Sequence, residues 1–358
     1  MSLPRPLQTV AAALEPSQLL GRPEVALDLD AARAFVSGRR LLVTGAAGSV
    51  GLPLVQTLIG LAPAHLVLVD HHEYTLFLVQ RYLREWAPET AVDLALADVR
   101  DASRVDRLFR RHRPEVVFHL AAYKHVPLGE ANPEEPLSVN VFGTLNVLEA
   151  AAAHGTEVVV YPSSDKAVYP PSLYGATKRI AELLVLRHGN AGVGARTAVR
   201  FVNILGTRGS VVETLAEQVL AGRPLTLTDP NMTRYWMSMG EAVGLLLVGA
   251  VAPTGSLLLL DTGPAVPVPE MAHRIARALA PDAWPPAIRF TGARPGERLW
   301  ELLHAERERL LPGPCDGVWR VAHEQEPALR ERVVRVADQL RSLPSTLAPD
   351  EVKAITME

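Results

Sequence analysis

From residue 39 onward, short apolar runs alternate with segments of helical periodicity, and this alternation limits the fold more than any other feature. The runs at 39–45 and 65–70 indicate buried strands, and the segments at 49–60 and 73–86 indicate helices. The same pattern predicts strands at 92–98, 115–122, 157–163 and 196–203, and helices near 101–112, 134–153 and 172–189. Six strands joined by crossover helices predict an α/β fold, with a doubly wound parallel sheet.

Composition excludes several classes of protein. A formal net charge of -3 gives no basic field for nucleic acid, and the single cysteine, Cys315, excludes an intrachain disulfide framework. Cysteine usage therefore favours a reducing compartment, and we expect the cytoplasm. The most apolar run, at 242–251, is about half the length of a membrane-spanning helix and predicts a buried helix. No membrane span and no nucleic-acid partner are expected.

A glycine-rich turn follows the first predicted strand directly. "LLVTGAAGSVG" puts Gly45, Gly48 and Gly51 between a buried strand and the start of a helix. Glycine permits a tight turn and close backbone approach to a pyrophosphate, whose charge free amides and the helix N-terminus would meet. A plain strand-to-helix turn is the alternative, but the alternating context favours a dinucleotide site.

Two aspartates end the next strands. Asp70 stands where an acid would accept hydrogen bonds from an adenosine ribose, which favours NAD over NADP because a 2′-phosphate would be repelled. The alternative is an aspartate that caps the following helix. A partly protonated His71 or His72 could tolerate the extra phosphate, so NADP stays possible. Asp98 could similarly face the adenine.

The chain accordingly divides into four predicted parts. Residues 1–38 form an N-terminal extension, an extended stretch plus a short helix packed on the sheet, and 39–203 form an NAD-binding Rossmann domain. After residue 203 the pattern is less regular and rich in glycine and proline, which predicts a smaller substrate-binding lobe at 204–310, interleaved with the first domain. Residues 311–358 form a C-terminal tail with a surface helix at 325–341.

Lysine is rare in this chain and gathers at one place. Of 36 basic side chains only four are lysines, and Lys166 and Lys178 both lie in "SSDKAVYPPSLYGATK". Tyr174 and Lys178 share one face of a predicted helix. An ammonium beside a phenol lowers the phenol's pKa, so Tyr174 could remove a hydroxyl proton while the adjacent carbon gives hydride to nicotinamide. A helix-face tyrosine beside a solvated lysine is the alternative.

Three polar residues follow the fifth predicted strand. Ser164, Asp165 and Lys166 emerge at the carboxyl edge of the sheet, where open parallel sheets bind ligands. Ser164 can hold the same substrate oxygen as Tyr174. A strand-end salt bridge is the alternative for Asp165 and Lys166.

Together these motifs resemble the extended short-chain dehydrogenase/reductase superfamily, and more closely its CapD-like polysaccharide-biosynthesis family of UDP-sugar dehydratases and epimerases. The resemblance runs from about Leu19 to Leu303 in six ordered blocks, which include "TGAAGSVG", "SSDKAVYPPSLYGATKRIAE", "LTLTDPNMTRYWMS" and "GARPGERLWELL". It implies NAD-dependent 4,6-dehydration of UDP-N-acetylglucosamine, in which Asp165 is the acid for the C6 hydroxyl and Lys166 the base for the C5 proton. Each of the two needs a shifted pKa.

The resemblance also implies the remaining site residues. Cofactor contacts come from the glycine turn, the strand ends and the catalytic helix: Gly45, Gly48, Ser49, Val50, Gly51, Asp70, Asp98, Val99, Ala121, Ala122, Lys124, Tyr174 and Lys178. Substrate contacts come from later loops: Lys124, His125, Asn140, Asn203, Arg208, Thr226, Arg234, Arg294 and Glu297. Asn140 resembles the superfamily asparagine that braces the active-site backbone, and arginine suits a diphosphate. No metal site is expected.

Two clues point to different subfamilies. Tyr174 resembles the soluble members that invert C5, whereas "LLGRPEVALDLDAARAFVSGRR" resembles the linker of longer, membrane-bound members. The C5 outcome therefore stays open. A UDP-sugar C4 epimerase is the nearest alternative function, and a nucleotide-sensing protein without turnover is a remote one. We expect a homo-oligomer, because helices at 134–153 and 172–189 pair subunits in many relatives.

Overall fold

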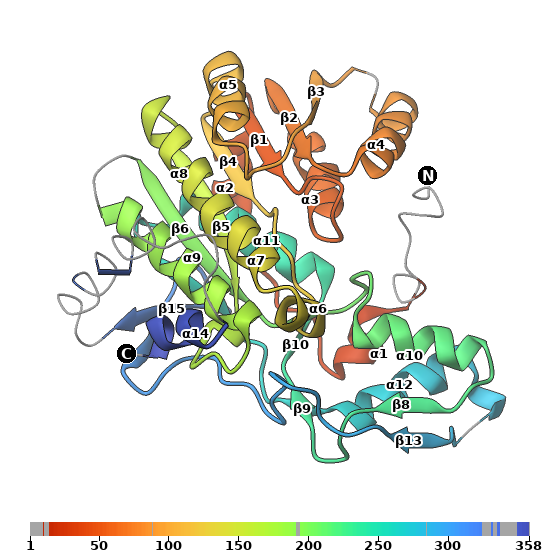
Figure 1. Ribbon diagram of the computed structural model, residues 1–358. Helices are drawn as coiled ribbons and strands as arrows, with labels where there is room; N and C mark the ends of the chain where they lie inside the picture. Colours follow the sequence, from red (N-terminus) through yellow and green to blue (C-terminus); the bar gives the residue numbers. More distant parts are fainter. Residues whose placement is uncertain are drawn as a thin grey trace.

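The computed structural model describes residues 10, 14–87, 89–190, 194–283, 285–323, 331, 335–336 and 349–357. Within this part of the chain, the predicted doubly wound sheet is confirmed, and its strand order is β14-β15-β11-β6-β5-β4-β1-β2-β3 (Figure 1). The strands are β1 (Arg40–Thr44), β2 (His65–Asp70), β3 (Val92–Leu96), β4 (Val116–His119), β5 (Val158–Ser164), β6 (Ala195–Phe201), β11 (Leu257–Leu260), β14 (Glu308–Pro312) and β15 (Val318–His323).

The first six strands and β11 run parallel, and the strand order reverses between β1 and β4. Such a reversal opens a crevice at the carboxyl ends of the strands, which is where ligands bind in sheets of this kind. The glycine-rich turn follows β1 at this point. The topology therefore places the glycine-rich turn at the crevice where the strand order reverses.

Helices cover both faces of the sheet because its central strands are apolar on both sides. On one face lie α2 (Asp30–Val36), α3 (Gly51–Ile59), α4 (Glu73–Trp86) and α11 (Met239–Val251). On the other lie α5 (Ala102–His112), α8 (Thr144–Ala153) and α9 (Leu173–Asn190). The apolar run at 242–251 is part of α11, whose buried start carries a capping box of Ser238 and Glu241. The prediction of a buried helix there is confirmed.

A smaller lobe lies beside the carboxyl edge of the sheet (Figure 1). Its own core, which includes Val212, Leu215, Met271 and Ile275, lies between α10 (Val211–Leu220) and α12 (Val268–Leu279). Three short strand pairs complete it: β8 (Leu225–Leu227) with β13 (Ile288–Phe290), β9 (Thr233–Arg234) with β12 (Val266–Pro267), and β7 (Asn203–Ile204) with β10 (Trp236–Met237).

The N-terminal extension divides between the two units. Helix α1 (Pro16–Leu20) buries Leu19 and Leu20 in the core of the lobe, whereas α2 packs on α11. We expected one short helix on the sheet. The extra helix contacts the lobe because its two leucines meet the apolar side of α12.

The region expected to be a tail contributes to the central sheet. Strands β14 and β15 form an antiparallel hairpin that extends the sheet from β11, so residues 311–312 and 318–323 are strand residues. Helix α14 (Pro349–Met357) packs against α9. The helix expected at 325–341 lies almost wholly outside the described residues. No helix in the described part of the chain is long and apolar enough to cross a bilayer.

Candidate active site

The glycine-rich turn has no room for side chains. Gly45 has φ 64°, and a Cβ on it would lie 2.8 Å from the backbone nitrogen of Ala121. A Cβ on Gly51, the first residue of α3, would lie 2.1 Å from the carbonyl oxygen of Gly45. Only glycine fits both positions. The backbone at the start of α3 can thus be approached closely by a bound phosphate, with no side chain on Gly45 or Gly51 between them.

Asp70 stabilises this turn from the end of β2. Its buried carboxylate accepts hydrogen bonds from the backbone amides of Ala47 and His72, each at 3.0 Å. The side chain also lines a cavity of about 410 Å³ together with His71. Asp70 therefore both shapes the glycine-rich turn and lines the cavity beside it. Other predicted cofactor residues that line this cavity are Gly45, Gly48, Asp98, Val99, Ala121 and Ala122.

Asp98 is an ion-pair partner as well as a cavity residue. Its Oδ2 accepts from Arg100 Nη2 at 2.6 Å, and its Oδ1 accepts from the Arg100 backbone at 2.9 Å. Burial raises the pKa of Asp98, but the hydrogen bonds from Arg100 lower it by more, so the pKa lies below its usual value. Asp98 stays ionised near neutral pH.

A second cavity, of about 1100 Å³, extends from the glycine-rich turn to the lobe. It brings together side chains that are far apart in the sequence. The predicted site residues that line it are Gly45, Gly48, Ser49, Val50, Gly51, Ala122, Lys124, His125, Ser164, Lys166, Tyr174, Lys178, Asn203, Arg208, Thr226, Arg234, Arg294 and Glu297.

Tyr174 and Lys178 lie one turn apart on α9, as predicted, and the cation that acts on the pKa of Tyr174 is Lys166. Burial raises the pKa of Tyr174, and the ammonium of Lys166 and a hydrogen bond with Ser164 lower it only in part. Lys178 instead donates to the carbonyl of Pro162, and its Nζ lies 4.1 Å from the centroid of the Tyr161 ring. Burial lowers the pKa of Lys178 to about 7. Lys178 is thus partly neutral at pH 7, whereas we expected it to stay charged.

Lys166 lies between two carboxylates. Its Nζ is 3.1 Å from Asp165 Oδ1 and 3.4 Å from Oε1 of Glu301, a buried residue of the segment before β14. Burial lowers the pKa of Lys166, but Asp165 and Glu301 raise it by more. The shift is opposite to the one that a base needs. Sequence reasoning missed Glu301, although it lies within the quoted block "GARPGERLWELL".

Asp165 is more enclosed than its neighbours. It is fully buried in the short 3₁₀ turn η4 (Asp165–Ala167), and its Oδ1 accepts from both Lys166 and Ser164. Its Oδ2 is buried and accepts no hydrogen bond within the described part of the chain. Among the described residues that line the large cavity are Lys166 and Glu301, but not Asp165.

Arg208 contacts the glycine-rich turn from the lobe side. Its Nη2 donates to the carbonyl of Ala47 at 2.6 Å, and its backbone amide donates to Ser49 Oγ at 3.1 Å. Lys124 in turn donates to the carbonyl of Arg208 at 2.7 Å. Two cations therefore stand next to the predicted phosphate site. Arg208 lines both cavities.

The other predicted substrate residues have clear structural partners. Arg234 donates to the carbonyls of Thr233, Arg298 and Leu299, so its guanidinium fixes the segment that carries Glu301. Further contacts pair Arg294 with Glu297, Thr226 with Gln218, and Asn203 with the carbonyl of Tyr235. Burial lowers the pKa of His125, which favours a neutral ring.

Asn140 contacts the backbone and not the cleft. It is fully buried in a π-helical turn, η3 (Leu137–Gly143), where it hydrogen-bonds both the N–H and the carbonyl of Tyr123. Its amide also donates to Thr177. Asn140 therefore braces the Tyr123 backbone, as the resemblance implied, and although it was also grouped with the substrate-binding residues it is not among the described residues that line either cavity.

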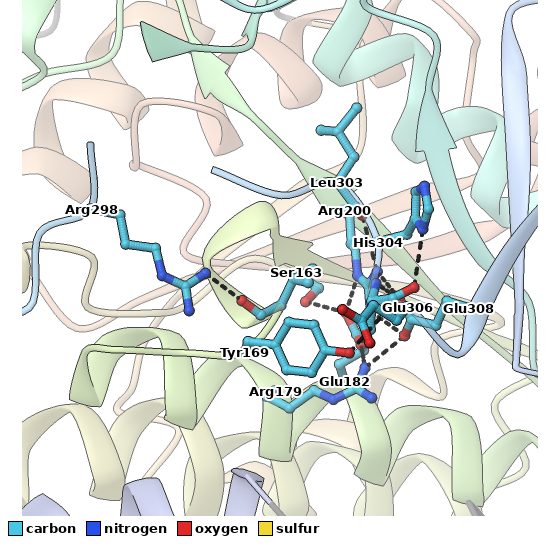
Figure 2. Close-up of polar contacts among 12 residues, drawn as sticks. Ser163, Tyr169, Arg179, Glu182, Arg200, Arg298, Leu303, His304, Glu306 and Glu308 are labelled. Atoms are coloured by element: carbon cyan, nitrogen blue, oxygen red, sulfur yellow. Dashed lines mark hydrogen bonds and ion pairs between the residues drawn. The ribbon is translucent and has the colours of Figure 1, made fainter. Parts of the chain in front are cut away.

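Sequence reasoning also missed a buried ion network beside β5 (Figure 2). Arg200 on β6 donates to Glu182 on α9 at 2.8 Å and to Glu308 on β14 at 2.7 Å, and Ser163 donates to Glu182 at 2.6 Å. Burial raises the pKa of Glu182, but Arg200 lowers it by more. The network joins the β14–β15 hairpin to β5, the strand that ends at Ser164.

Two further hydrogen bonds link the segment at 298–308 to the loop that follows Lys166 (Figure 2). Arg298 donates to the carbonyl of Val168 at 2.9 Å, and the backbone amide of Glu306 donates to the Tyr169 hydroxyl at 3.1 Å. Tyr169 itself has φ 43°, a left-handed conformation. The segment at 298–308 therefore holds the loop that follows Lys166.

Comparison with known proteins identifies the family of this chain. A family model described as polysaccharide biosynthesis protein matches residues 41–321, which include the glycine-rich turn, the Tyr174 helix and Glu301. The chain belongs to this polysaccharide biosynthesis family. Its similarity to the "Probable polysaccharide biosynthesis protein EpsC" of Bacillus subtilis is 38% identity over 85% of the chain, which spans 52% of that protein. The chain thus covers about half the length of EpsC.

The chain is also similar to relatives with more specific names. A "UDP-N-acetylglucosamine 4,6-dehydratase (inverting)" of Campylobacter jejuni is 30% identical over 75% of the chain and 78% of its own length. A "UDP-glucose 4-epimerase" of Rickettsia typhi is 29% identical over 79% of the chain and 82% of its own length. Both names describe reactions on UDP-sugars.

Solved structures share the fold. Pen from Bacillus thuringiensis superposes with a TM-score of 0.74 at 28% identity, covering 82% of this chain and 90% of its own. MoeE5 in complex with UDP-glucose and NAD superposes with a TM-score of 0.62 at 27% identity, covering 74% and 89%. The expected resemblance to nucleotide-sugar dehydratases and epimerases is confirmed at the level of family and fold.

Proposed function

We propose that this chain is an NAD-dependent UDP-N-acetylhexosamine 4,6-dehydratase, with UDP-N-acetylglucosamine as the first substrate to test. The observation that carries the proposal is the cluster of Lys166, Asp165 and Glu301 beside Tyr174, of which Lys166, Glu301 and Tyr174 line one cleft. Oxidation and reduction alone do not need such a cluster. Removal of water across C5 and C6 needs both a proton donor and a proton acceptor.

The glycine-rich turn suits NAD. Gly45 and Gly51 leave room only for backbone, Arg208 and Lys124 add positive charge beside the turn, and Asp70 faces the smaller cavity. A carboxylate there suits a free ribose better than a 2′-phosphate. When bound, NAD would accept hydride from C4 of the sugar and return it at C6, so no net redox change occurs.

Tyr174 and Ser164 would hold the C4 hydroxyl, and Tyr174 would accept its proton. Positive charge from Lys166 offsets part of the rise in the pKa of Tyr174 that burial causes. The diphosphate would lie near Arg208, Asn203 and Arg294 in the larger cavity. The lobe would thus hold the nucleotide while the sheet edge carries the reacting sugar.

The test is incubation of the purified chain with UDP-N-acetylglucosamine, followed by mass analysis of the nucleotide sugar. A dehydratase gives a product that has lost one water. A C4 epimerase, which the similarity to the Rickettsia typhi protein also supports, gives a product of unchanged mass. A protein that binds NAD and UDP-sugar without any turnover would be a sensor, and the proposal would be wrong.

A further inference from the structure

The charge state of Lys166 bears on the direction of proton transfer in the proposed dehydration, and the inference rests on that proposed function. Two carboxylates lie within 3.4 Å of the Lys166 Nζ, at 3.1 Å for Asp165 and 3.4 Å for Glu301. Their combined charge raises the pKa of Lys166 above its usual value despite burial. A lysine in this setting holds its proton and can give one away.

Of the two carboxylates beside Lys166, Glu301 is the one that lines the large cavity. It lines the large cavity with Lys166 and Tyr174, whereas Asp165 does not line it among the described residues. The second oxygen of Asp165 is buried against protein and has no partner in the described part of the chain. The Glu301 side chain is 4% exposed and stands at the wall of this cavity.

Glu301 is also held firmly in place. Arg234 Nε lies 3.9 Å from its carboxylate, and the Arg234 guanidinium donates to the carbonyls of Arg298 and Leu299 just before it. Arg298 then ties the same segment to Val168 in the loop after Lys166. Glu301 and Lys166 are therefore fixed relative to each other, as an acid–base pair requires.

We propose that Glu301 is the general base and Lys166 the general acid of the elimination, with Asp165 as the residue that positions Lys166. Once C4 is a ketone, the Glu301 carboxylate takes the C5 proton, the C5–H and C6–O bonds break, and a C5–C6 double bond forms. Lys166 gives its proton to the departing C6 hydroxyl, which leaves as water. The proton on Glu301 then passes to the neutral Lys166 amine and restores the pair.

The experiment separates proton removal from water loss. A 4-keto-6-deoxy UDP-sugar, the expected product, has no C6 hydroxyl to expel, so exchange of its C5 hydrogen with solvent needs the base but not the acid. We would incubate this compound with the NAD-loaded protein in D₂O and follow deuterium at C5 by NMR. The variants are Glu301→Gln, Lys166→Met and Asp165→Asn, all compared at the same mildly alkaline pH.

The expected result is that Glu301→Gln slows C5 exchange by about 100-fold or more, in the range typical of a lost general base. Lys166→Met should keep exchange within a few-fold yet lose dehydration of UDP-N-acetylglucosamine. Asp165→Asn should keep measurable exchange. Two outcomes overturn the assignment. In the first, Lys166→Met loses C5 exchange, whether or not Glu301→Gln also loses it. In the second, Asp165→Asn loses C5 exchange while Glu301→Gln keeps it.

Two controls keep the result interpretable. Thermal unfolding and NAD binding show whether each variant folds. If Glu301→Gln does not fold, Glu301→Asp replaces it, because this change keeps the negative charge but moves it away from the substrate. Undiminished C5 exchange in Glu301→Asp overturns the assignment. The unmodified protein separates the two proposals. If it neither dehydrates UDP-N-acetylglucosamine nor exchanges C5, the proposed function fails; if it does both and Glu301→Gln still exchanges, only the base assignment fails.

Discussion

At the scale of single residues, three lysines that look alike in the sequence differ in their surroundings. Lys124 donates to a backbone carbonyl, Lys166 lies between two carboxylates, and Lys178 is buried under an aromatic ring. Carboxylates raise the pKa of Lys166, while burial lowers that of Lys178 to about 7. The same side chain therefore serves as a stable cation in one place and a titrating group in another.

Lys178→Met tests the second of these states. Because the pKa of Lys178 falls from 10.5 to about 7 on folding, the unfolded chain binds more protons between these values and the free energy of unfolding should rise with pH across that window. The variant should lose this rise and be no less stable at pH 7. Denaturant unfolding at several pH values measures it.

Lys353→Met is the matched control for that measurement. Lys353 pairs with Glu130 at 3.0 Å and is not among the described residues that line either cavity. Its loss should leave the pH dependence between these limits unchanged. A Lys178→Met variant with the same slope as the unmodified protein would contradict the assigned pKa shift.

At the scale of elements, the turn between β1 and α3 depends on close backbone packing. Gly51→Ala places a Cβ 2.1 Å from the Gly45 carbonyl, so backbone must move. We expect a loss of about 1–3 kcal/mol in the free energy of unfolding, and NAD binding weakened by at least tenfold, because the amides shift. Gly60→Ala at the other end of α3 meets its nearest atom at 3.4 Å and should leave NAD affinity unchanged. Calorimetric titration with NAD compares the two.

A second prediction at this scale concerns the ion network that joins α9, β6 and β14. Glu182→Gln leaves Arg200 with one carboxylate in a fully buried site, and we expect a loss of about 3–5 kcal/mol in the free energy of unfolding. The control is Glu157→Gln, which breaks a half-exposed pair with Arg39 and should cost about 1 kcal/mol or less. Equal losses in the two variants would show that the network contributes no more than a surface pair.

The same network gives a pH dependence. Arg200 lowers the pKa values of Glu182 and Glu308 from 4.5, so the stability they contribute is present above that pH and is lost as the pH falls below it. Glu182→Gln should therefore flatten the decline in stability on acidification. Acid unfolding followed by circular dichroism provides the measurement.

At the scale of the whole molecule, the cleft exists only because the lobe faces the carboxyl edge of the sheet. Arg294 and Arg234 both line it, but the Arg294 side chain is 62% exposed, whereas Arg234 is buried and hydrogen-bonded to backbone. Arg294→Met should weaken UDP binding by about tenfold with no change in melting temperature, as loss of one charge-assisted contact predicts. Arg234→Met should lower both the affinity for UDP and the melting temperature. Unchanged UDP affinity in Arg294→Met would remove that residue from the site.

Much of the fold and part of the candidate site could be predicted from local patterns. Alternating apolar runs locate the first six strands, and the helix spacing of Tyr174 and Lys178 is set by the α-helical repeat alone. The glycine turn is equally local, because the backbone conformation and close approach at Gly45 and Gly51 exclude other residues. These features hold because strand and helix periodicity depends on neighbours within a few positions.

What the tertiary structure decided depends on residues far apart in the chain. Glu301 meets Lys166, Glu308 meets Arg200, and the β14–β15 hairpin extends the sheet, although no local pattern marks any of these pairings. The charge states follow from those pairings, since a pKa is set by burial and by nearby charges rather than by residue type. The sequence by itself determined which chemical groups the chain carries and on which elements they lie. The fold decided which of them meet and which hold a proton, because only packing fixes the distances and the burial that control electrostatic energy.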